Sequence, residues 1–386
     1  MKTRDLATSA FRFVLIIGVA NLFADMTYEG ARGITGPFLG SLGASATIVG
    51  FVAGFGELIG YSLRSVSGYL ADKSSKYWII TFVGYLINML AVPALALAGN
   101  WPLAAALIVA ERAGRAVRRP AVEAMLSYAG KSIGRGWVFG LNEALDQGGA
   151  TVGPLITALV LYLHGSYQNA FAVLLISALL CFGTLVIARV HYPHPGELEE
   201  KPARSLQTKR FSKRYWLYLA AGALIAAGFA DFALIAFHFQ KTAIVAKSMI
   251  PVLYAAAMAT GALSSLVFGR MLDKLGLSVL LMAVLLSALF APFVFLGGLT
   301  LALIGMSSGG SAWQHRIHCS KPSWPTLSRE KSEARHSACL TLVLALPGSL
   351  VVPPWGYCMT NQYSLWCSFL SYFNWPLCQF CFLPDV

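Results

Sequence analysis

Long apolar runs of membrane-crossing length set the first constraint on this chain. About 20 consecutive, mostly apolar residues cross a bilayer as an α-helix, and such runs recur from residue 11 to about residue 296. Of the 386 residues, 57% are hydrophobic and 12% are charged, whereas a soluble domain carries about 25% charged residues. Because backbone groups inside lipid must bond within their own helix, the sequence predicts an all-α polytopic membrane protein.

A polar stretch divides the apolar runs into two groups. The first group predicts six helices, at 11–39, 47–70, 77–99, 101–119, 137–163 and 170–190. Pro120 is expected to end the fourth of these helices, which leaves Lys131 and Arg135 on a basic loop or a surface helix. The second group predicts helices at 215–240, 248–272 and 277–296 and the start of another at 299–306.

We therefore expect about nine to ten clear transmembrane helices in four regions of the chain. Residues 1–190 form a six-helix half, and residues 191–214, which are rich in Glu, Lys, Arg and Pro, form a linker. Residues 215–306 form part of a second half, and residues 307–386 form a tail of different composition.

The basic residues gather in the loops on one side of the predicted helices. The turns after the first, third and fifth helices contain no Lys or Arg, and Lys241 and Lys247 are the exceptions among the later turns. Basic loops stay in the cytoplasm, so we expect a cytoplasmic N-terminus and linker in a multi-pass protein of the cytoplasmic membrane. This distribution explains the net charge of +12 better than nucleic-acid binding does.

A polar signature follows the second predicted helix and recurs 201 residues later, after the eighth. Its residues are Gly68, Asp72, Lys73 and Lys76 in the first copy, and Gly269, Asp273 and Lys274 in the second. A repeat at half the chain length indicates a duplicated unit. The alternative is an ordinary helix end with a solvated charge, but two copies at equivalent positions favour a loop with a shared role.

These features resemble the major facilitator superfamily over residues 1 to about 306. The resemblance implies a fold of six plus six helices, here with an incomplete second half, and loops at the two signatures that gate the cytoplasmic side. Gly149, Gly153 and Pro154 resemble the first half of the family's antiporter motif, although small residues four apart also pack helices in general. Arg112 resembles the family's arginine in the fourth helix.

Ionisable side chains inside a bilayer are costly, so each one is a functional candidate. The candidates for substrate binding or proton coupling are Asp25, Glu29, Arg32, Glu57, Glu111, Arg112, Glu143, Asp146 and Asp231. Spacings of four and three place Asp25, Glu29 and Arg32 on one helix face, and these carboxylates are the first choice. The alternative for any one residue is a fixed ion pair that only packs helices.

The sequence thus predicts a secondary active transporter that moves a small molecule by alternating access, with proton-coupled efflux as the favoured form. A uniporter or symporter is the alternative within that class, and a non-transporting degenerate membrane protein or sensor is the alternative outside it. No nucleotide-binding loop, catalytic arrangement or metal-ligand spacing occurs, so we expect no enzyme activity, cofactor or metal. The expected partners are the substrate, protons and lipid; we expect a monomer.

The tail after residue 306 differs abruptly from the rest. It holds six of the seven cysteines and none of the long unbroken apolar runs seen earlier. Codons for Ser, Cys, Trp and Phe arise when an apolar gene segment is read one base out, so we hypothesise a frameshift near codon 306; a divergent natural C-terminus is the alternative. The nucleotide sequence tests this, because a continuous apolar reading frame must then appear in another frame.

Overall fold

The computed structural model describes residues 3–74, 76–198, 231–275, 293–294, 300–301 and 303–306. All regular elements in these residues are helices, which confirms the all-α prediction. The long helices are α1 (Thr3–Ser41), α2 (Ala46–Ser74), α3 (Tyr77–Ala94), α4 (Trp101–Ile133), α5 (Arg135–His164), α6 (Tyr167–His191), α8 (Phe232–Thr242) and α9 (Met249–Leu275). Two short 3₁₀ helices are η1 (Leu95–Leu97) and η2 (Pro195–Leu198). The predicted helix at 277–296, except 293–294, the linker beyond residue 198 and the tail lie outside the described residues.

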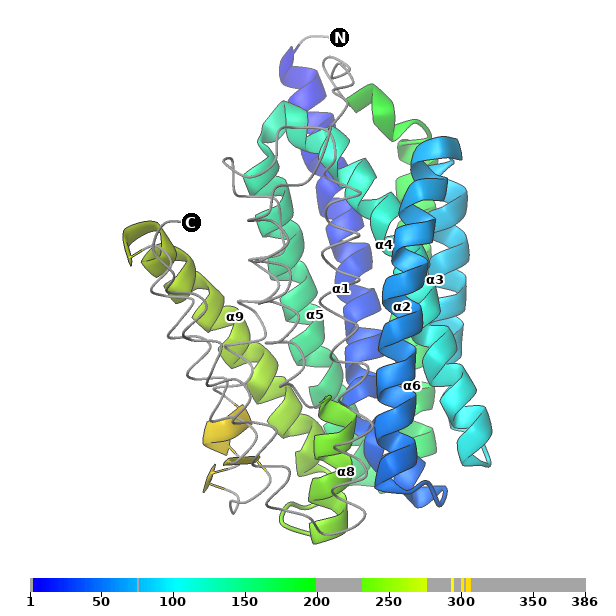
Figure 1. Ribbon diagram of the computed structural model, residues 1–386. Coiled ribbons are helices and arrows are strands. Elements are labelled where there is room, and N and C mark those ends of the chain that lie inside the picture. The colour runs from blue at the N-terminus through cyan, green and yellow to red at the C-terminus, as the bar shows by residue number, and fades with distance from the viewer. Residues whose placement is uncertain are drawn as a thin grey trace, which may run out of the picture.

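Helix α1 runs through the middle of the bundle (Figure 1) and packs on α4, α5, α6 and α8. Many of its apolar residues are buried, including Phe13, Ile17 and Ala24 at 0% exposure, although Phe11 and Leu15 near its N-terminal end are exposed. A helix that is covered on most sides in this way can hold polar side chains away from lipid. The polar residues of α1 therefore face other helices rather than the bilayer.

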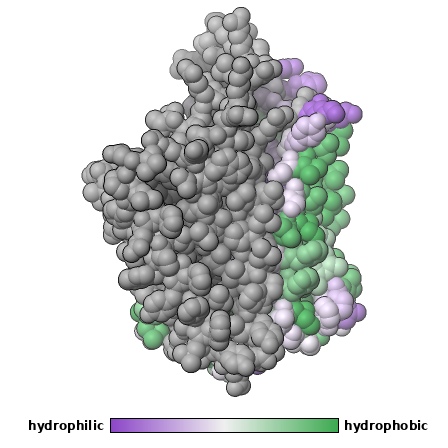
Figure 2. Space-filling model, in the orientation of Figure 1, coloured by the Kyte–Doolittle hydropathy of each residue, from purple (hydrophilic) through white to green (hydrophobic). Residues whose placement is uncertain are grey.

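Five helices among the described residues are long and apolar enough to span a membrane: α1, α2, α3, α5 and α6. Helix α4 is 33 residues long but carries several arginines. The outer face of α3 exposes Ile79, Val83, Leu86 and Leu90, a stripe at helical spacing. Figure 2 shows the resulting hydrophobic band between more hydrophilic ends, on the side where α2 and α3 lie.

Glycines on α5 let its backbone approach α1 closely. A Cβ atom added to Gly149 would collide with the carbonyl oxygen of Leu22, and one added to Gly153 would collide with that of Met26. The spacing of four therefore allows close helix packing. This agrees with the second interpretation of these glycines given above, that small residues four apart pack helices in general. The neighbouring Gly148 has room for a Cβ, whose nearest contact would be a Leu22 methyl carbon at 3.9 Å.

We expect Gly149→Ala to destabilise the fold by about 1–3 kcal/mol, the usual range for overpacking, because the obstacle is backbone rather than a movable side chain. Thermal unfolding of the detergent-purified protein measures the effect. Gly148→Ala is the matched control and should leave the midpoint nearly unchanged. Equal midpoints for both variants would contradict the close α1–α5 contact.

The two signature segments are helical, and this corrects the predicted boundaries. Helix α2 continues through Asp72 and Lys73 to Ser74, and α9 continues through Asp273 to Leu275, whereas both segments were expected to be loops. The Ser74 hydroxyl donates to the Leu70 carbonyl at 2.7 Å, and the positive charge of Lys73 favours the C-terminal end of a helix. These local interactions extend the last turn of α2.

Pro120 does not end its helix, contrary to the sequence prediction; α4 continues to Ile133. Proline is tolerated in transmembrane helices when neighbouring groups satisfy the freed carbonyls. Ser67 of α2 donates to the Val117 carbonyl at 2.6 Å. That carbonyl is next to the one of Ala116, which loses its helical partner because Pro120 has no amide hydrogen. Gly68 lies near the Pro120 ring, where an added Cβ would be 3.6 Å from the nearest ring carbon, an ordinary contact distance.

The break between α4 and α5 falls instead at Gly134, whose φ of 98° is strained for residues with a side chain. Lys131 thus lies at the end of α4 and Arg135 at the start of α5. The basic segment is therefore helical on both sides of a single glycine.

The chain after the linker begins its described part at Asp231 and packs on the C-terminal end of α1. Asp231 has extended backbone and caps α8, since its carboxylate accepts from the Ala233 amide at 2.9 Å. The expectation of one continuous helix over 215–240 is therefore wrong at this residue. Gly36 of α1 lies directly against the Ala233 carbonyl, which brings α8 close to α1 at the lower end of Figure 1.

Lys247, one of the two exceptions to the charge distribution, lies just before α9 and contacts the turn between α5 and α6. Its ammonium donates to the Gly165 carbonyl at 2.9 Å and lies 3.8 Å from the centre of the Tyr167 ring. We expect Lys247→Ala to lower stability by about 0.5–1 kcal/mol, the usual worth of an exposed cation–π contact. Thermal unfolding tests this against Lys241→Ala, which removes an exposed lysine; equal effects would contradict the contact.

Candidate functional site

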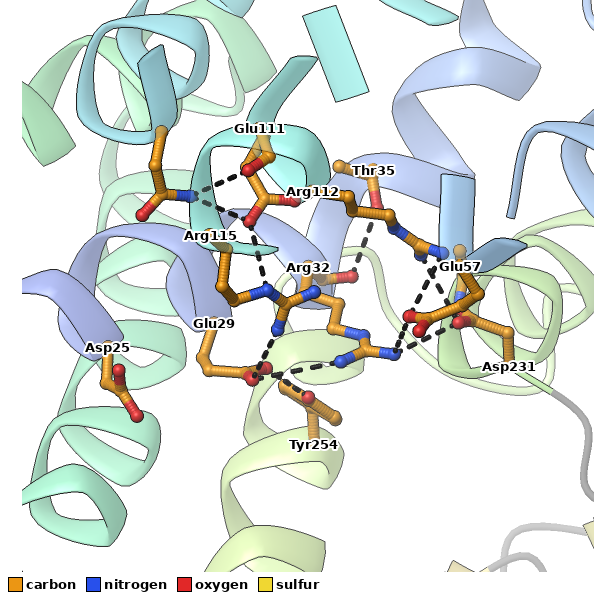
Figure 3. A network of polar contacts seen from close by, with 12 residues as sticks. Asp25, Glu29, Arg32, Thr35, Glu57, Glu111, Arg112, Arg115, Asp231 and Tyr254 are labelled. Carbon is orange, nitrogen blue, oxygen red and sulfur yellow. Dashed lines mark hydrogen bonds and ion pairs between the residues drawn. The ribbon is translucent and has the colours of Figure 1, made fainter. Parts of the chain in front are cut away.

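Two arginines and two carboxylates form a compact ion-pair square in the interior, which we call the charge square (Figure 3). Arg32 and Arg112 each contact both Glu57 and Asp231. The nitrogen–oxygen distances from Arg32 are 3.4 Å to Glu57 and 3.0 Å to Asp231, and those from Arg112 are 3.1 Å and 3.3 Å. Only 6% of the Asp231 and Arg112 side chains is exposed, so the four charges neutralise one another away from water.

Four helices position the charge square. Arg32 comes from α1, Glu57 from α2 and Arg112 from α4, while Asp231 caps α8. Gly56 makes room for Arg112, because a Cβ there would lie 2.7 Å from the arginine Cδ. Arg112 also donates to the Ala53 carbonyl, so α2 supplies both the space and a hydrogen-bond acceptor for this buried side chain.

A second group lies beside the charge square and centres on Glu29. Tyr254 of α9 donates a short hydrogen bond to Glu29, while Arg32 and Arg115 approach the same carboxylate at 3.8 Å and 3.9 Å. Arg115 also lies 3.6 Å from Glu111. Glu29 is therefore shared between helices on the two sides of the linker, as Figure 3 shows.

Asp25 belongs to a separate group, nearer the N-terminal end of α1. Its ion-pair partner is Arg118 at 3.9 Å, and not Arg32, although the sequence placed all three on one helix face. Arg118 donates to Asn21 at 3.2 Å and stacks over the Tyr85 ring at 4.2 Å. Tyr85 also donates a short hydrogen bond to Asn21, so this group is tied to both α3 and α4.

The α5 candidates lie apart from the charge square. Asn142 donates to Asp146 at 3.0 Å, and Gln147 donates to Glu143 at 3.2 Å. Asn142 in turn accepts from Asn21 at 2.7 Å, which links α5 to the Asp25 group. Within the described residues, no cluster of three His, Cys, Asp or Glu side chains is placed to hold a metal ion.

The signature residues are only partly described. The Lys73 side chain is exposed and lies 5.9 Å from the Tyr69 ring centre, and Lys76 is also exposed. The side chains of Asp72, Asp273 and Lys274 and the surroundings of Gly269 are not described. A gating role for these residues stays a prediction.

Sequence reasoning missed several members of the site. Tyr254, Tyr28 and Arg115 have central contacts but were not among the candidates. Arg115 had a local signal, because it lies three residues after Arg112 and so shares its helix face. Tyr254 had none, since it lies 225 residues from its partner Glu29.

A small cavity of about 20 Å³, room for about one water molecule, lies beside the two groups around Arg32. Its polar lining consists of Tyr28, Arg32, Thr35, Glu111, Arg112 and Arg115. Its apolar lining consists of Ala31, Val92, Leu95 and Ile108. This volume is well below the range for small-molecule sites, which are typically mostly apolar with a few convergent polar groups.

Comparison with known proteins agrees with this architecture. Residues 17–338 match the Major Facilitator Superfamily, which extends the resemblance past the boundary near 306 expected from the sequence. An uncharacterized protein of Mycobacterium tuberculosis is 41% identical over 312 residues, covering 79% of this chain and 76% of the relative. An uncharacterized MFS-type transporter of Methanocaldococcus jannaschii is 28% identical over 273 residues, covering 68% and 67%.

Solved transporters share the fold at low sequence identity. A POT family transporter in complex with 5-aminolevulinic acid superimposes with a TM-score of 0.78 at 10% identity, covering 95% of both chains. A mutant of the nucleoside transporter NupG gives 0.69 at 13% identity, covering 96% of this chain and 97% of the other. The family match covers most of the chain and agrees with its helical bundle and buried charges. This chain therefore belongs to the Major Facilitator Superfamily of membrane transporters.

Proposed function

We propose that the chain is a secondary active transporter that exports a small molecule in exchange for protons. The observation that carries the proposal is the position of Glu29. Arg32 and Arg115 approach this carboxylate from α1 and α4, and Tyr254 reaches it from α9, beyond the linker. Transport by rocking of two halves around a midplane site would change the partners of such a residue.

The physical basis is the balance of charge around one carboxyl group. Positive charges and donated hydrogen bonds stabilise a carboxylate, whereas burial without them favours the neutral acid. When the halves separate at Tyr254, Glu29 loses a donor and its surroundings change. A proton taken up in one conformation and released in the other couples the proton gradient to the movement of the halves.

Orientation and direction form part of the same proposal. The N-terminus, the linker and the signature segments lie in the cytoplasm, and the protein is a monomer of the cytoplasmic membrane that does not bind nucleic acid. The excess of Lys and Arg at that end supports the orientation. Residues 1–190 and 215–306 are the first half and the incomplete second half, and the signature residues Asp72 and Asp273 gate the cytoplasmic side.

The other candidate residues have supporting roles in this proposal. Asp25, Glu143 and Asp146 form a polar path along α1 and α5 towards Glu29. The charge square of Arg32, Glu57, Arg112 and Asp231 and the neighbouring Glu111 surround the substrate. The antiporter role of Gly149, Gly153 and Pro154 acts through the close α1–α5 contact.

Proton flux in inverted membrane vesicles tests the function. Respiration acidifies such vesicles, and a pH-sensitive dye reports the gradient while solutes from a broad panel are added. We expect an exported solute to discharge the gradient in vesicles that contain the chain, or its version with the apolar reading frame restored after codon 306. Flux without proton movement would indicate a uniporter, and proton movement in the same direction as the solute would indicate a symporter. No flux from the restored version would favour the non-transporting sensor.

A further inference from the structure

The charge square and the group around Glu29 form one continuous network whose formal charges do not sum to zero. The nitrogen–oxygen distance of every ion pair in it is 3.9 Å or less, and Figure 3 shows how the pairs connect. Among the residues that the structure describes, the network consists of the bases Arg32, Arg112 and Arg115 and the acids Glu29, Glu57, Glu111 and Asp231. Three guanidinium groups therefore face four carboxyl groups.

A bound proton compensates the fourth carboxyl group. Arginine keeps its charge in proteins, so the imbalance falls on the acids. The side chains of the network are between 6% and 23% exposed, and a carboxylate without a compensating charge in such surroundings takes up a proton instead of staying ionised. One of the four carboxyl groups is therefore expected to be neutral.

The distances assign this proton to Glu29 and Glu111. Asp231 and Glu57 each contact two arginines, at 3.0 to 3.4 Å, so the charge square is balanced by itself. Glu29 and Glu111 are left with one further guanidinium, that of Arg115, at 3.9 Å and 3.6 Å. Two carboxyl groups that share one positive charge titrate as a pair, and the proton belongs to both.

The groups that face this pair from the neighbouring helices leave the balance unchanged. Tyr254 of α9 donates to one acid of the pair and Asn88 of α3 donates to the other, and both are neutral side chains. The Tyr28 ring of α1 lies 4.6 Å from the carbon centre of the shared guanidinium. Asp25, the next acid along α1, has its own arginine, Arg118 of α4, at 3.9 Å. The acids of α5 bond to side chains of their own helix.

We propose that Glu29 and Glu111 share one proton while α8 is docked on α1, and that this proton leaves when α8 withdraws Asp231. The proposal deepens the proton exchange proposed above and rests on it. Asp231 and Glu29 compete for one guanidinium, because Arg32 lies 3.0 Å from the first and 3.8 Å from the second. Without Asp231, Arg32 is available to Glu29, and three carboxylates face three guanidiniums. The proton then passes to the solvent that enters between the separated halves.

The infrared spectrum of the purified full chain tests this assignment at equilibrium. The carbonyl stretch of a neutral carboxylic acid is separate from that of a carboxylate, and isotope labelling of glutamate shifts it only when the acid is a glutamate. In detergent at neutral pH we expect the band of one neutral glutamic acid. Asp231→Asn should remove this band, because the remaining acids and arginines are equal in number.

Arg115→Gln should have the opposite effect. It leaves four acids with two guanidiniums, so the neutral-acid band should grow about twofold. Glu123→Gln is the matched control, since its carboxyl group is 40% exposed and pairs with Arg64 at 2.8 Å, outside the network. Its spectrum should keep the band of the unaltered chain.

A neutral-glutamate band that persists in Asp231→Asn would overturn the proposal, since burial alone would then account for it. So would the lack of such a band in the unaltered chain, or an unchanged band in Arg115→Gln. If Asp231→Asn does not fold, Glu57→Gln replaces it, because this variant also removes one carboxyl group of the charge square and should also lose the band. The spectra need no transported solute, so their failure leaves proton exchange to the vesicle test, and a lack of flux there would leave the spectra unaltered.

Discussion

Replacing Asp231 by Ala should destabilise the protein by about 3–5 kcal/mol, the usual cost of removing one partner from a buried ion pair. The carboxylate neutralises Arg32 and Arg112 together, and 6% of its side chain is exposed. Without it, Arg112 keeps only Glu57, which it shares with Arg32, while Arg32 also keeps the more distant Glu29 at 3.8 Å. Loss of the α8 cap through the Ala233 amide adds about 1 kcal/mol. Thermal unfolding in detergent measures the sum.

Two further variants separate these causes. Asp231→Asn keeps an oxygen that caps α8 but removes the charge, so it should retain most of the destabilisation. Adding Arg112→Gln to Asp231→Asn removes one guanidinium as well, so the double variant should be less unstable than the sum of the single ones. Glu123→Gln is the control, since its carboxylate is 40% exposed and should contribute about 0–1 kcal/mol. Strict additivity of Asp231→Asn and Arg112→Gln would contradict the charge square.

Glu29→Gln should abolish gradient-driven transport, with a loss of two orders of magnitude or more in the proton flux that accompanies solute. The amide keeps the shape of the side chain and its ability to accept from Tyr254, but it cannot gain and lose a proton between conformations. Exchange of solute down its own gradient should persist, because that process needs no proton. Vesicle flux with and without an imposed pH gradient measures both quantities.

The control for Glu29→Gln is a carboxylate outside the two central groups. Glu123→Gln alters a side chain that is 40% exposed and pairs with Arg64 at 2.8 Å and with Arg119 at 3.2 Å, and we expect it to keep most of the gradient-driven flux. Full gradient-driven flux in Glu29→Gln would reject Glu29 as the coupling group.

The positions of the membrane helices could be predicted from the sequence because hydrophobicity along one segment is a local property. The ranges predicted for 77–99, 137–163 and 170–190 overlap α3, α5 and α6 closely. Prediction failed where a neighbouring helix changed the local outcome. Pro120 was expected to end a helix, but α4 continues past it, with Ser67 of α2 donating to the Val117 carbonyl.

The composition of the candidate site followed from the sequence more fully than its pairing did. Nine ionisable residues in the predicted helices were candidates on energetic grounds, and three of them, Glu29, Arg32 and Glu57, do lie in the two groups around the cavity. Their partners could not be assigned, because helical spacing relates only residues on the same helix. Asp25 therefore lies with Arg118 rather than with Arg32.

The sequence by itself determined that this chain is a helical membrane protein with buried charges, since lipid requires long apolar runs and makes each interruption costly. The tertiary structure decided which charges neutralise one another. Arg32 and Asp231 are 199 residues apart along the chain and 3.0 Å apart in space. That contact depends on how α8 packs against α1, and ion pairing of this kind is set by the distance between atoms on different helices rather than by any pattern within one.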